Sequence, residues 1–220
     1  MDANLTDEER LEVIKKWWRE NGSSIITGVV LGLAVLFGSK AWFSYQETNA
    51  QNAANIYVTM MSALQTGDAL VVAEKTDQLV TEHAGTPYAA LAAMAMAKIG
   101  IEAGELNDAR AQLHWVLDNS KSEIFKDVAR LRLARVLVAM GDLDAAETLL
   151  QQPASGAAFD PLYTEVRGDL QIARGDTVAA HTAYQEALAA TAAGSPGRHM
   201  LELKYQGTQG AAAASGAQQE

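Results

Sequence analysis

The sequence predicts an all-α protein in which one N-terminal transmembrane helix is followed by a solenoid of helical repeats. Three observations lead to this fold class. Nineteen consecutive uncharged residues separate Glu20 from Lys40, glycines recur at a near-constant interval further on, and alanine is abundant whereas proline and aromatic residues are few. Since alanine is the best helix former and aromatic residues favour strands, this composition indicates packed helices.

The composition also excludes several classes of functional site. The 220 residues leave room for one sizeable core, and a net charge of −10 argues against nucleic acid as a partner. Without cysteine the chain has no disulfide, no thiolate metal site and no cysteine nucleophile. The sequence has none of the common catalytic or nucleotide-binding motifs, so we expect no enzyme, no cofactor and no metal site. The histidines lie far apart and lack metal-ligand spacing: His83, His114, His181 and His199.

The uncharged segment predicts a transmembrane helix over residues 23–43. Nineteen helical residues cover roughly 28 Å, close to the thickness of a hydrocarbon core. Aromatic residues flank both ends, as at membrane interfaces: Trp17, Trp18, Trp42, Phe43 and Tyr45. A buried core helix and a cleaved signal peptide are the alternatives. A signal peptide would need a small-residue cleavage site, whereas this chain continues through Lys40.

Basic residues set the expected orientation. Four of them precede the span, namely Arg10, Lys15, Lys16 and Arg19, whereas Lys40 alone follows closely. By the positive-inside rule the N-terminus is cytoplasmic. Residues 1–22 are then a cytoplasmic amphipathic tail, with Leu11, Ile14 and Trp18 on one face. The chain is expected to be a single-pass type II (N-in) protein of a bacterial inner membrane, with its bulk in the periplasm if the source is Gram-negative.

Small residues line one face of the predicted span. Ser24, Gly28 and Gly32 recur every four residues, and such a stripe lets another transmembrane helix approach closely. A helix-packing face is one interpretation. The other is chance, because glycine is common in membrane helices.

Repeats are evident after residue 50. Gly67, Gly104, Gly141 and Gly175 are 37, 37 and 34 residues apart, and an acidic residue follows each of them. Glycine ends a helix in a left-handed cap, and an acidic residue suits the N-terminus of the next helix. Small residues recur five positions after three of the glycines, at Ala109, Ala146 and Ala180. This is the tetratricopeptide layout, although the large aromatic residues of the first helix are mostly missing.

The sequence therefore predicts a tetratricopeptide-like helical-repeat solenoid of about four helix pairs with a C-terminal capping helix, over residues 44–206. The expected pairs are 50–66 with 70–84, 88–103 with 106–119, 123–140 with 143–152, and 161–174 with 177–192. A short amphipathic helix, HMLELKYQ, is expected to cap the open end. The low-complexity segment 207–220 is expected to be disordered.

The first helix of each pair is expected to line a concave, protein-binding groove. Tetratricopeptide geometry assigns the groove to Leu91, Met94, Lys98, Ile101, Val128, Leu131, Arg135, Val138, Leu162, Glu165, Asp169 and Ile172. Apolar rows with isolated charges suit a helix or an unfolded apolar segment. The alternative is that the apolar members are inter-repeat core. Arg130, Arg132 and Arg135 form a basic cluster, either as ion pairs on a solvated face or as an anion or peptide contact.

The chain resembles the ancillary subunit of the bacterial Sec translocon, a family of tetratricopeptide-like, single-pass inner-membrane proteins. The resemblance covers about residues 8–205 and is carried by VIKKWWRENG before the span, LRLARVLVAMGDLDAA in the third repeat and VRGDLQIARGDTVAAHTAY in the fourth. It implies an anchor beside the SecYEG channel. It also implies periplasmic repeats that associate with a membrane-anchored chaperone of the prolyl-isomerase type and help pass newly translocated, unfolded proteins to periplasmic chaperones.

Three functional hypotheses remain open at the level of sequence. The chain is a translocon-associated adaptor or chaperone, a generic membrane-tethered scaffold for envelope assembly, or a regulator of stress signalling that acts through its cytoplasmic tail. The resemblance favours the first. It transfers no catalytic residue.

Overall fold

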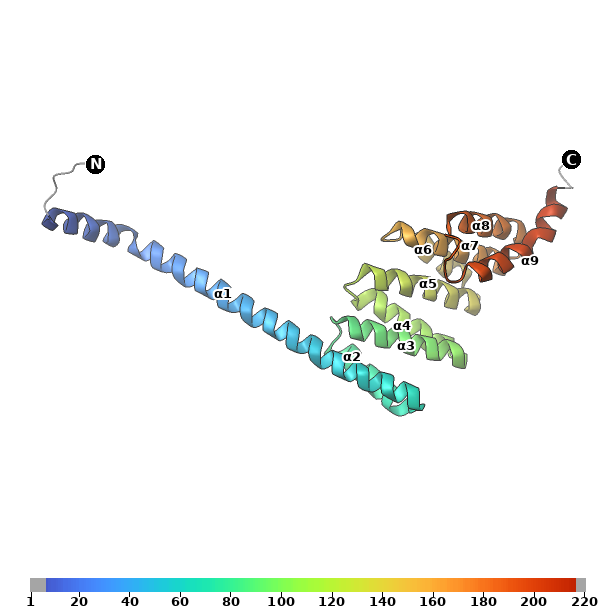
Figure 1. Cartoon of the computed structure of the whole chain (residues 1–220), viewed down its shortest axis with the longest axis horizontal. Helices are drawn as coiled ribbons and strands as arrows, with labels where there is room; N and C mark the ends of the chain where they lie inside the picture. Colours follow the sequence, from blue (N-terminus) through green and yellow to red (C-terminus); the bar gives the residue numbers. More distant parts are fainter. Residues whose placement is uncertain (1–6, 217–220) are drawn as a thin grey trace. The chain divides into compact units, whose positions relative to one another are not determined.

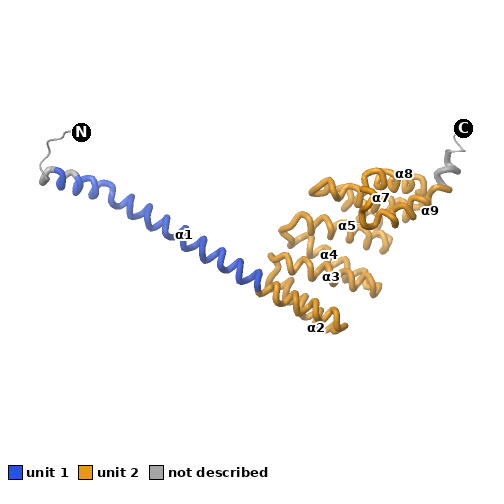
Figure 2. Tube along the Cα trace, in the orientation of Figure 1, with its two compact units in different colours: residues 1–51 blue, residues 52–220 orange. Residues whose placement is uncertain are grey.

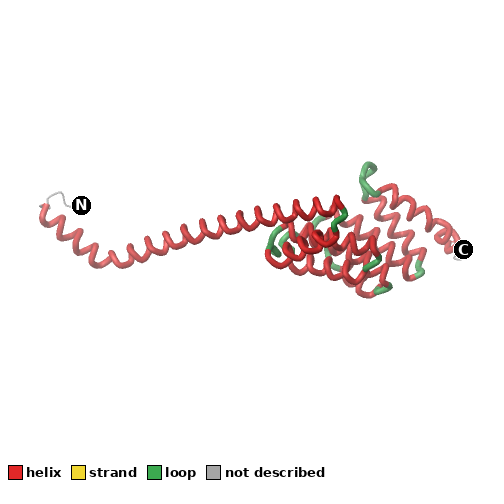
Figure 3. The backbone as a smooth tube through the Cα atoms, turned by 90° about the horizontal axis from the view of Figure 1, so that it is seen from below, coloured by secondary structure: helices red, strands yellow, loops and turns green. Residues whose placement is uncertain are grey.

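A computed structural model describes residues 7–216, without the side chains of residues 7–9, 13 and 211–216. Over that range the chain is helical with short connections and no strand (Figures 1 and 3). It divides into two compact units, residues 1–51 and 52–220 (Figure 2). The all-α fold class is therefore confirmed.

Helix α1 (Asp7–Thr66) includes the uncharged segment and also supplies the first helix of the first repeat. The tail, the span and the first repeat helix were expected as separate segments, but no break separates them. The physical reason is that no proline precedes Pro87, so nothing forces the helix to end earlier. Among the described residues, α1 is the one helix long and apolar enough to cross a membrane.

The remaining helices follow the predicted repeats to within about two residues, apart from the C-terminal helix. They are α2 (Ala69–Glu82), α3 (Pro87–Ala103), α4 (Leu106–Asn119), α5 (Glu123–Met140), α6 (Leu143–Gln151), the 3₁₀ turn η1 (Ala157–Phe159), α7 (Asp160–Arg174), α8 (Thr177–Ala190) and α9 (Arg198–Gly216). Within residues 52–220 consecutive helices pack against one another, from α2 on α3 to α8 on α9 (Figure 1).

The repeat glycines end the first helix of each pair as expected. Gly67, Gly104, Gly141 and Gly175 have φ between +77° and +83°, a conformation that favours glycine because it has no Cβ. Of the acidic residues that follow, Asp68 and Asp176 accept hydrogen bonds from the N–H groups of Val71 and Ala179. Glu105 and Asp142 make no such side-chain cap.

Small residues let the two helices of a pair lie close together. Ala97 and Ala109 are both fully buried in the main core, as are Ala134 and Ala146. In the fourth pair Gly168 takes the alanine position, and a Cβ there would lie 2.4 Å from Cε1 of Tyr184. The large buried aromatic ring is therefore accommodated only because residue 168 has no side chain.

A buried carboxylate joins the third repeat to the fourth. Asp127 of α5 accepts hydrogen bonds from the N–H and hydroxyl of Ser155, in the loop between α6 and α7. It also accepts one from the hydroxyl of Tyr163 on α7 at 3.1 Å, and it pairs with Arg130 at 2.7 Å. Burial alone would raise the pKa of this carboxyl, but the hydrogen bonds from Ser155 and Tyr163 and the charge of Arg130 hold the pKa below its ordinary value.

The C-terminal helix caps the solenoid but is longer than predicted. Leu201 of α9 is buried against Ala180, Tyr184 and Ala187 of α8, so the expected cap is present. Disorder was expected from residue 207 onward, but α9 continues to Gly216. The reason is a tertiary contact, since Thr208 is buried and its hydroxyl lies 2.9 Å from Nδ1 of His181. Residues 217–220 of the expected disordered tail lie outside the described residues.

The contact at Gly168 predicts that a single methyl group destabilises the repeat domain. Gly168→Ala should lower the free energy of unfolding by about 1–3 kcal/mol, the usual cost of overpacking, even though alanine is the better helix former. Gly207→Ala is the matched control, because a Cβ at Gly207 of α9 meets no atom within 4 Å. That control should raise stability by about 0.5–1 kcal/mol. Urea unfolding of the full chain measures both, and a Gly168→Ala protein as stable as the wild type would contradict the packing described.

The Asp127 network predicts a specific dependence of stability on pH. Because folding lowers the pKa of Asp127, its carboxylate stabilises the fold above the pKa of the unfolded chain, and that stability is lost as the pH falls through the folded pKa. Asp127→Asn should cost about 2–3 kcal/mol at pH 7, and its difference from the wild type should shrink below about pH 4. Thermal unfolding between pH 7 and pH 3 tests this, with exposed Asp77→Asn as the control. A difference that does not change with pH would rule out the ionised carboxylate as the stabilising form.

Candidate protein-binding surface

The first helices of the second, third and fourth repeats are α3, α5 and α7, which carry the residues assigned to the concave groove. Met94 and Leu131 are buried and belong to the main hydrophobic core. For these two residues the interpretation as inter-repeat core is the one that fits the structure. Leu91 and Val128 are half-buried and pack against the same core, so they offer a partner only part of their surface.

The exposed groove positions lie further along the helices. Lys98 is exposed and lies 3.5 Å from Glu102 on the same helix. Arg135 is partly exposed, and Leu162 of α7 exposes 41% of its surface. Ile101 and Ile172 expose similar fractions, whereas Val138 is half-buried. The surface available to a partner therefore consists of separate apolar and basic positions, with no continuous apolar stripe.

In the fourth repeat the groove carboxylates are already paired within the protein. Nζ of Lys204 on α9 lies 2.6 Å from Glu165 and 2.7 Å from Asp169. Asp169 also accepts a hydrogen bond of 2.9 Å from the hydroxyl of Tyr184. Burial and the adjacent carboxylates raise the pKa of Tyr184, so the phenol keeps its proton and remains a donor. We conclude that Asp169 holds the capping helix in place and is not available to a ligand.

The three arginines of α5 have different surroundings. Arg130 is largely buried and bonds to Asp127 and to the hydroxyl of Tyr163, so its role is structural. Arg135 reaches Glu165 at 3.6 Å, a long contact for an ion pair. Arg132 is exposed and pairs with no carboxylate in the described part of the chain. The predicted basic cluster thus has one internal member and two members that face solvent.

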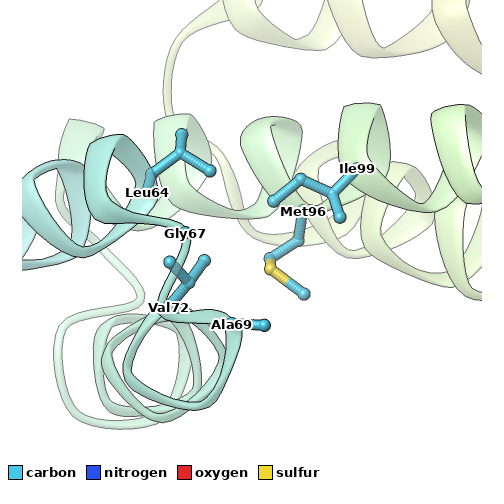
Figure 4. Close-up of a pocket in the computed structure, with 6 residues that line it drawn as sticks. All are labelled: Leu64, Gly67, Ala69, Val72, Met96 and Ile99. Carbon is cyan, nitrogen blue, oxygen red and sulfur yellow. The ribbon is translucent and has the colours of Figure 1, made fainter.

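An apolar pocket opens between the first and second repeats. It has a volume of about 160 Å³ and is lined by Leu64, Gly67, Ala69, Val72, Met96 and Ile99. Figure 4 shows Met96 and Ile99 of α3 on one side, and the corner between α1 and α2 on the other. A pocket of this size, open to solvent and with an almost wholly apolar lining, suits one aliphatic or aromatic side chain of a partner.

Sequence reasoning missed this pocket because the groove was assigned only from the second repeat onward. One signal could have found it. Leu64 precedes Ile101 by 37 residues, the same interval that separates the repeat glycines. Extending the groove positions back by one repeat would have assigned Leu64 to the binding surface.

Among the described residues, no group of three histidine or acidic side chains is placed so that it could hold a metal ion. His181 stacks on Tyr205 with ring centroids 4.5 Å apart and contacts Thr208. It therefore helps to join α8 to α9.

The small-residue face of α1 is exposed. Ser24, Gly28 and Gly32 lie on successive turns, and a Cβ added to either glycine would meet no other atom within 4 Å. The spacing and the exposure are as a helix-packing face requires. That role stays a prediction.

Comparison with known proteins places the chain in a family. Residues 15–209 match the family described as tetratricopeptide repeat-like domain. Proteins named ancillary SecYEG translocon subunit are 31% identical in Haemophilus influenzae, over 85% of this chain and 91% of the relative. In Escherichia coli the identity is 32%, over 84% of this chain and 88% of the relative. In Neisseria gonorrhoeae it is 26%, over 93% and 98%. No solved structure matches the chain.

The family match extends through both the apolar segment and the helical repeats, and the similarity to the relatives covers most of each chain. The chain therefore belongs to the family of ancillary SecYEG translocon subunits.

Proposed function

We propose that this protein is a non-enzymatic, membrane-anchored ancillary subunit of the Sec translocon, and that its repeat domain binds partner proteins outside the cytoplasm. The observation that carries the proposal is the combination of one long apolar helix and a helical-repeat domain in a single chain, which is similar over most of its length to proteins of that name. Neither part would support the proposal alone, because apolar helices and helical repeats occur in many unrelated proteins.

The proposed topology follows from the charges that flank the span. Four basic residues precede it and Lys40 alone follows closely, so the N-terminus is cytoplasmic and residues 44–216 lie in the periplasm. The stripe of Ser24, Gly28 and Gly32 would contact a helix of the channel or of a membrane-anchored prolyl-isomerase-type chaperone. Exposed positions of the repeat domain would receive newly translocated chains or that chaperone.

The absence of cysteine makes the topology directly testable. Leu11→Cys and Leu70→Cys each introduce a single thiol at an exposed position, on either side of the span. A membrane-impermeant maleimide should label the Leu70→Cys protein in intact spheroplasts and the Leu11→Cys protein only after the membrane is permeabilised. The reverse pattern would show that the orientation is opposite to the one proposed.

Site-specific photo-crosslinking in intact cells tests the association with the translocon. A probe at Gly32 should form adducts with SecYEG or with the membrane-anchored chaperone, because Gly32 lies on the small-residue face. A probe at Val30, which is exposed on the opposite side of the helix, is the matched control and should yield at least about fivefold fewer adducts.

Lys98 and Leu162 are suitable probe positions in the repeat domain because both are exposed, whereas a probe at a buried groove residue such as Leu131 would not reach a partner. Adducts with translocating chains or with the chaperone would support the proposed adaptor role. Adducts from all these positions that contain only unrelated envelope proteins would contradict it and would favour a general assembly scaffold.

A further inference from the structure

A second pocket lies between the second and third repeats. It has a volume of about 180 Å³, and it is lined by Ile101, Leu106, Val136, Ala139, Arg132 and Arg135. Its lining is almost wholly apolar, as in the pocket at Leu64, but it includes two arginines. Arg130 is bound to Asp127 in the internal network, so Arg132 and Arg135 are the members of the basic cluster that can face a ligand.

The two pockets are the same structural position in successive repeats. Leu64 and Ile101, Ala69 and Leu106, and Ile99 and Val136 are each 37 residues apart, which equals the repeat length. The positions of Arg132 and Arg135 correspond in the earlier repeat to Ala95 and Lys98. The solenoid therefore presents two equivalent apolar cavities, of which the second has the stronger positive charge.

The second pocket is basic, although the repeat domain as a whole is acidic. Residues 52–220 contain twelve Lys and Arg against twenty Asp and Glu, a net charge of −8. Arg132 nevertheless has no carboxylate partner among the described residues. In the part of the chain that the structure describes, the one carboxylate near Arg135 is that of Glu165 at 3.6 Å, and Lys204 lies closer to this carboxylate, at 2.6 Å. A carboxylate arriving from outside would gain charge-assisted hydrogen bonds from guanidinium groups that the protein leaves incompletely paired.

We propose that the paired pockets form a docking site for an extended polypeptide segment that carries two aliphatic side chains and an acidic side chain. One aliphatic side chain enters the pocket at Leu64 and the other enters the pocket at Ile101. The acidic side chain beside the second aliphatic residue pairs with Arg132 and Arg135. This inference rests on the proposed function and deepens it, because it states the chemistry of the segment that the repeat domain recognises.

The repeat geometry also sets the spacing of the two aliphatic side chains. The two pockets lie on either side of α3, because Met96 and Ile99 line the first and Ile101 lines the second. They are therefore separated by about one helix diameter, roughly 10 Å. A polyproline II segment advances about 3.1 Å per residue and returns to the same face every third residue. Aliphatic residues at positions i and i+3 therefore match the two pockets, with the acidic residue next to one of them.

Fluorescence anisotropy with defined peptides tests the proposal on the full chain in lipid nanodiscs. The probes are fluorescein-labelled Ala-Leu-Ala-Pro-Leu-Glu-Ala and its reversed order, Ala-Glu-Leu-Pro-Ala-Leu-Ala, which together cover both directions of binding. At least one should bind saturably, and replacing its Glu by Gln should weaken binding to the wild type about fivefold, the size of a well-placed ion pair.

Variants of the protein locate the site. Arg132→Gln should weaken binding of the acidic peptide about fivefold and should reduce the effect of the Glu-to-Gln exchange in the peptide, which then reflects Arg135 alone. Ala139→Phe, which places a ring at the exposed edge of the second pocket, should weaken binding at least about tenfold through lost apolar burial. Arg110→Gln on α4, which lines neither pocket, is the matched control and should bind like the wild type. Unfolding midpoints of all variants should agree, which separates lost binding from lost folding.

Each outcome decides the proposal. Saturable binding with coupling between Arg132 and the peptide carboxylate supports it. Absence of binding by either peptide overturns it, as does binding that is indifferent to both Arg132→Gln and Ala139→Phe. Translocon adducts from Gly32 in cells are independent of the pockets, so their presence alongside a negative peptide result would leave the proposed function standing.

Discussion

The close approach of paired helices is the constraint on which the rest of the repeat domain depends. A Cβ added to Gly100 would lie 3.2 Å from the carbonyl oxygen of Glu105 and 3.4 Å from Cβ of Ala109, so α3 and α4 touch almost backbone to backbone. Such contact requires small residues at the facing positions and a tight glycine turn between the helices. Once these are in place, each pair has nearly the same shape, and stacking the pairs buries a continuous core.

Polar contacts between helices stabilise the fourth repeat, where the spacing of the repeat residues is less regular. The interval between glycines shortens from 37 to 34 residues at the fourth repeat, and the loop before α7 replaces a tight turn. Here Asp127 ties the loop and α7 to α5 through Ser155 and Tyr163. At the open end, Lys204 joins α9 to Glu165 and Asp169 of α7. These buried or half-buried carboxylates are fully paired, as burial of charge requires.

The same packing decides what the domain can offer a partner. Side chains such as Met94 and Leu131 fill the space between helices, and the carboxylates of the last repeat hold the cap. The apolar pockets lie at the junctions between the first three repeats, beside the helix turns. The proposed binding sites thus lie where adjacent repeats leave their shared surface incompletely filled, and Arg132, which pairs with no carboxylate in the described part of the chain, gives one of them positive charge.

The sequence by itself determined the helix boundaries of the repeats between Ala69 and Ala190 and the position of the apolar segment. These features are local, because a glycine with positive φ ends a helix wherever it occurs, and a run of uncharged residues is visible without any neighbour. Tertiary structure alone decided which groove residues are accessible. It also decided that α9 continues past Gly207 and that Asp127, Arg130 and Ser155 form one network. Burial and ion pairing at these positions depend on side chains that lie up to 39 residues away in the chain, and no local pattern of residues specifies them.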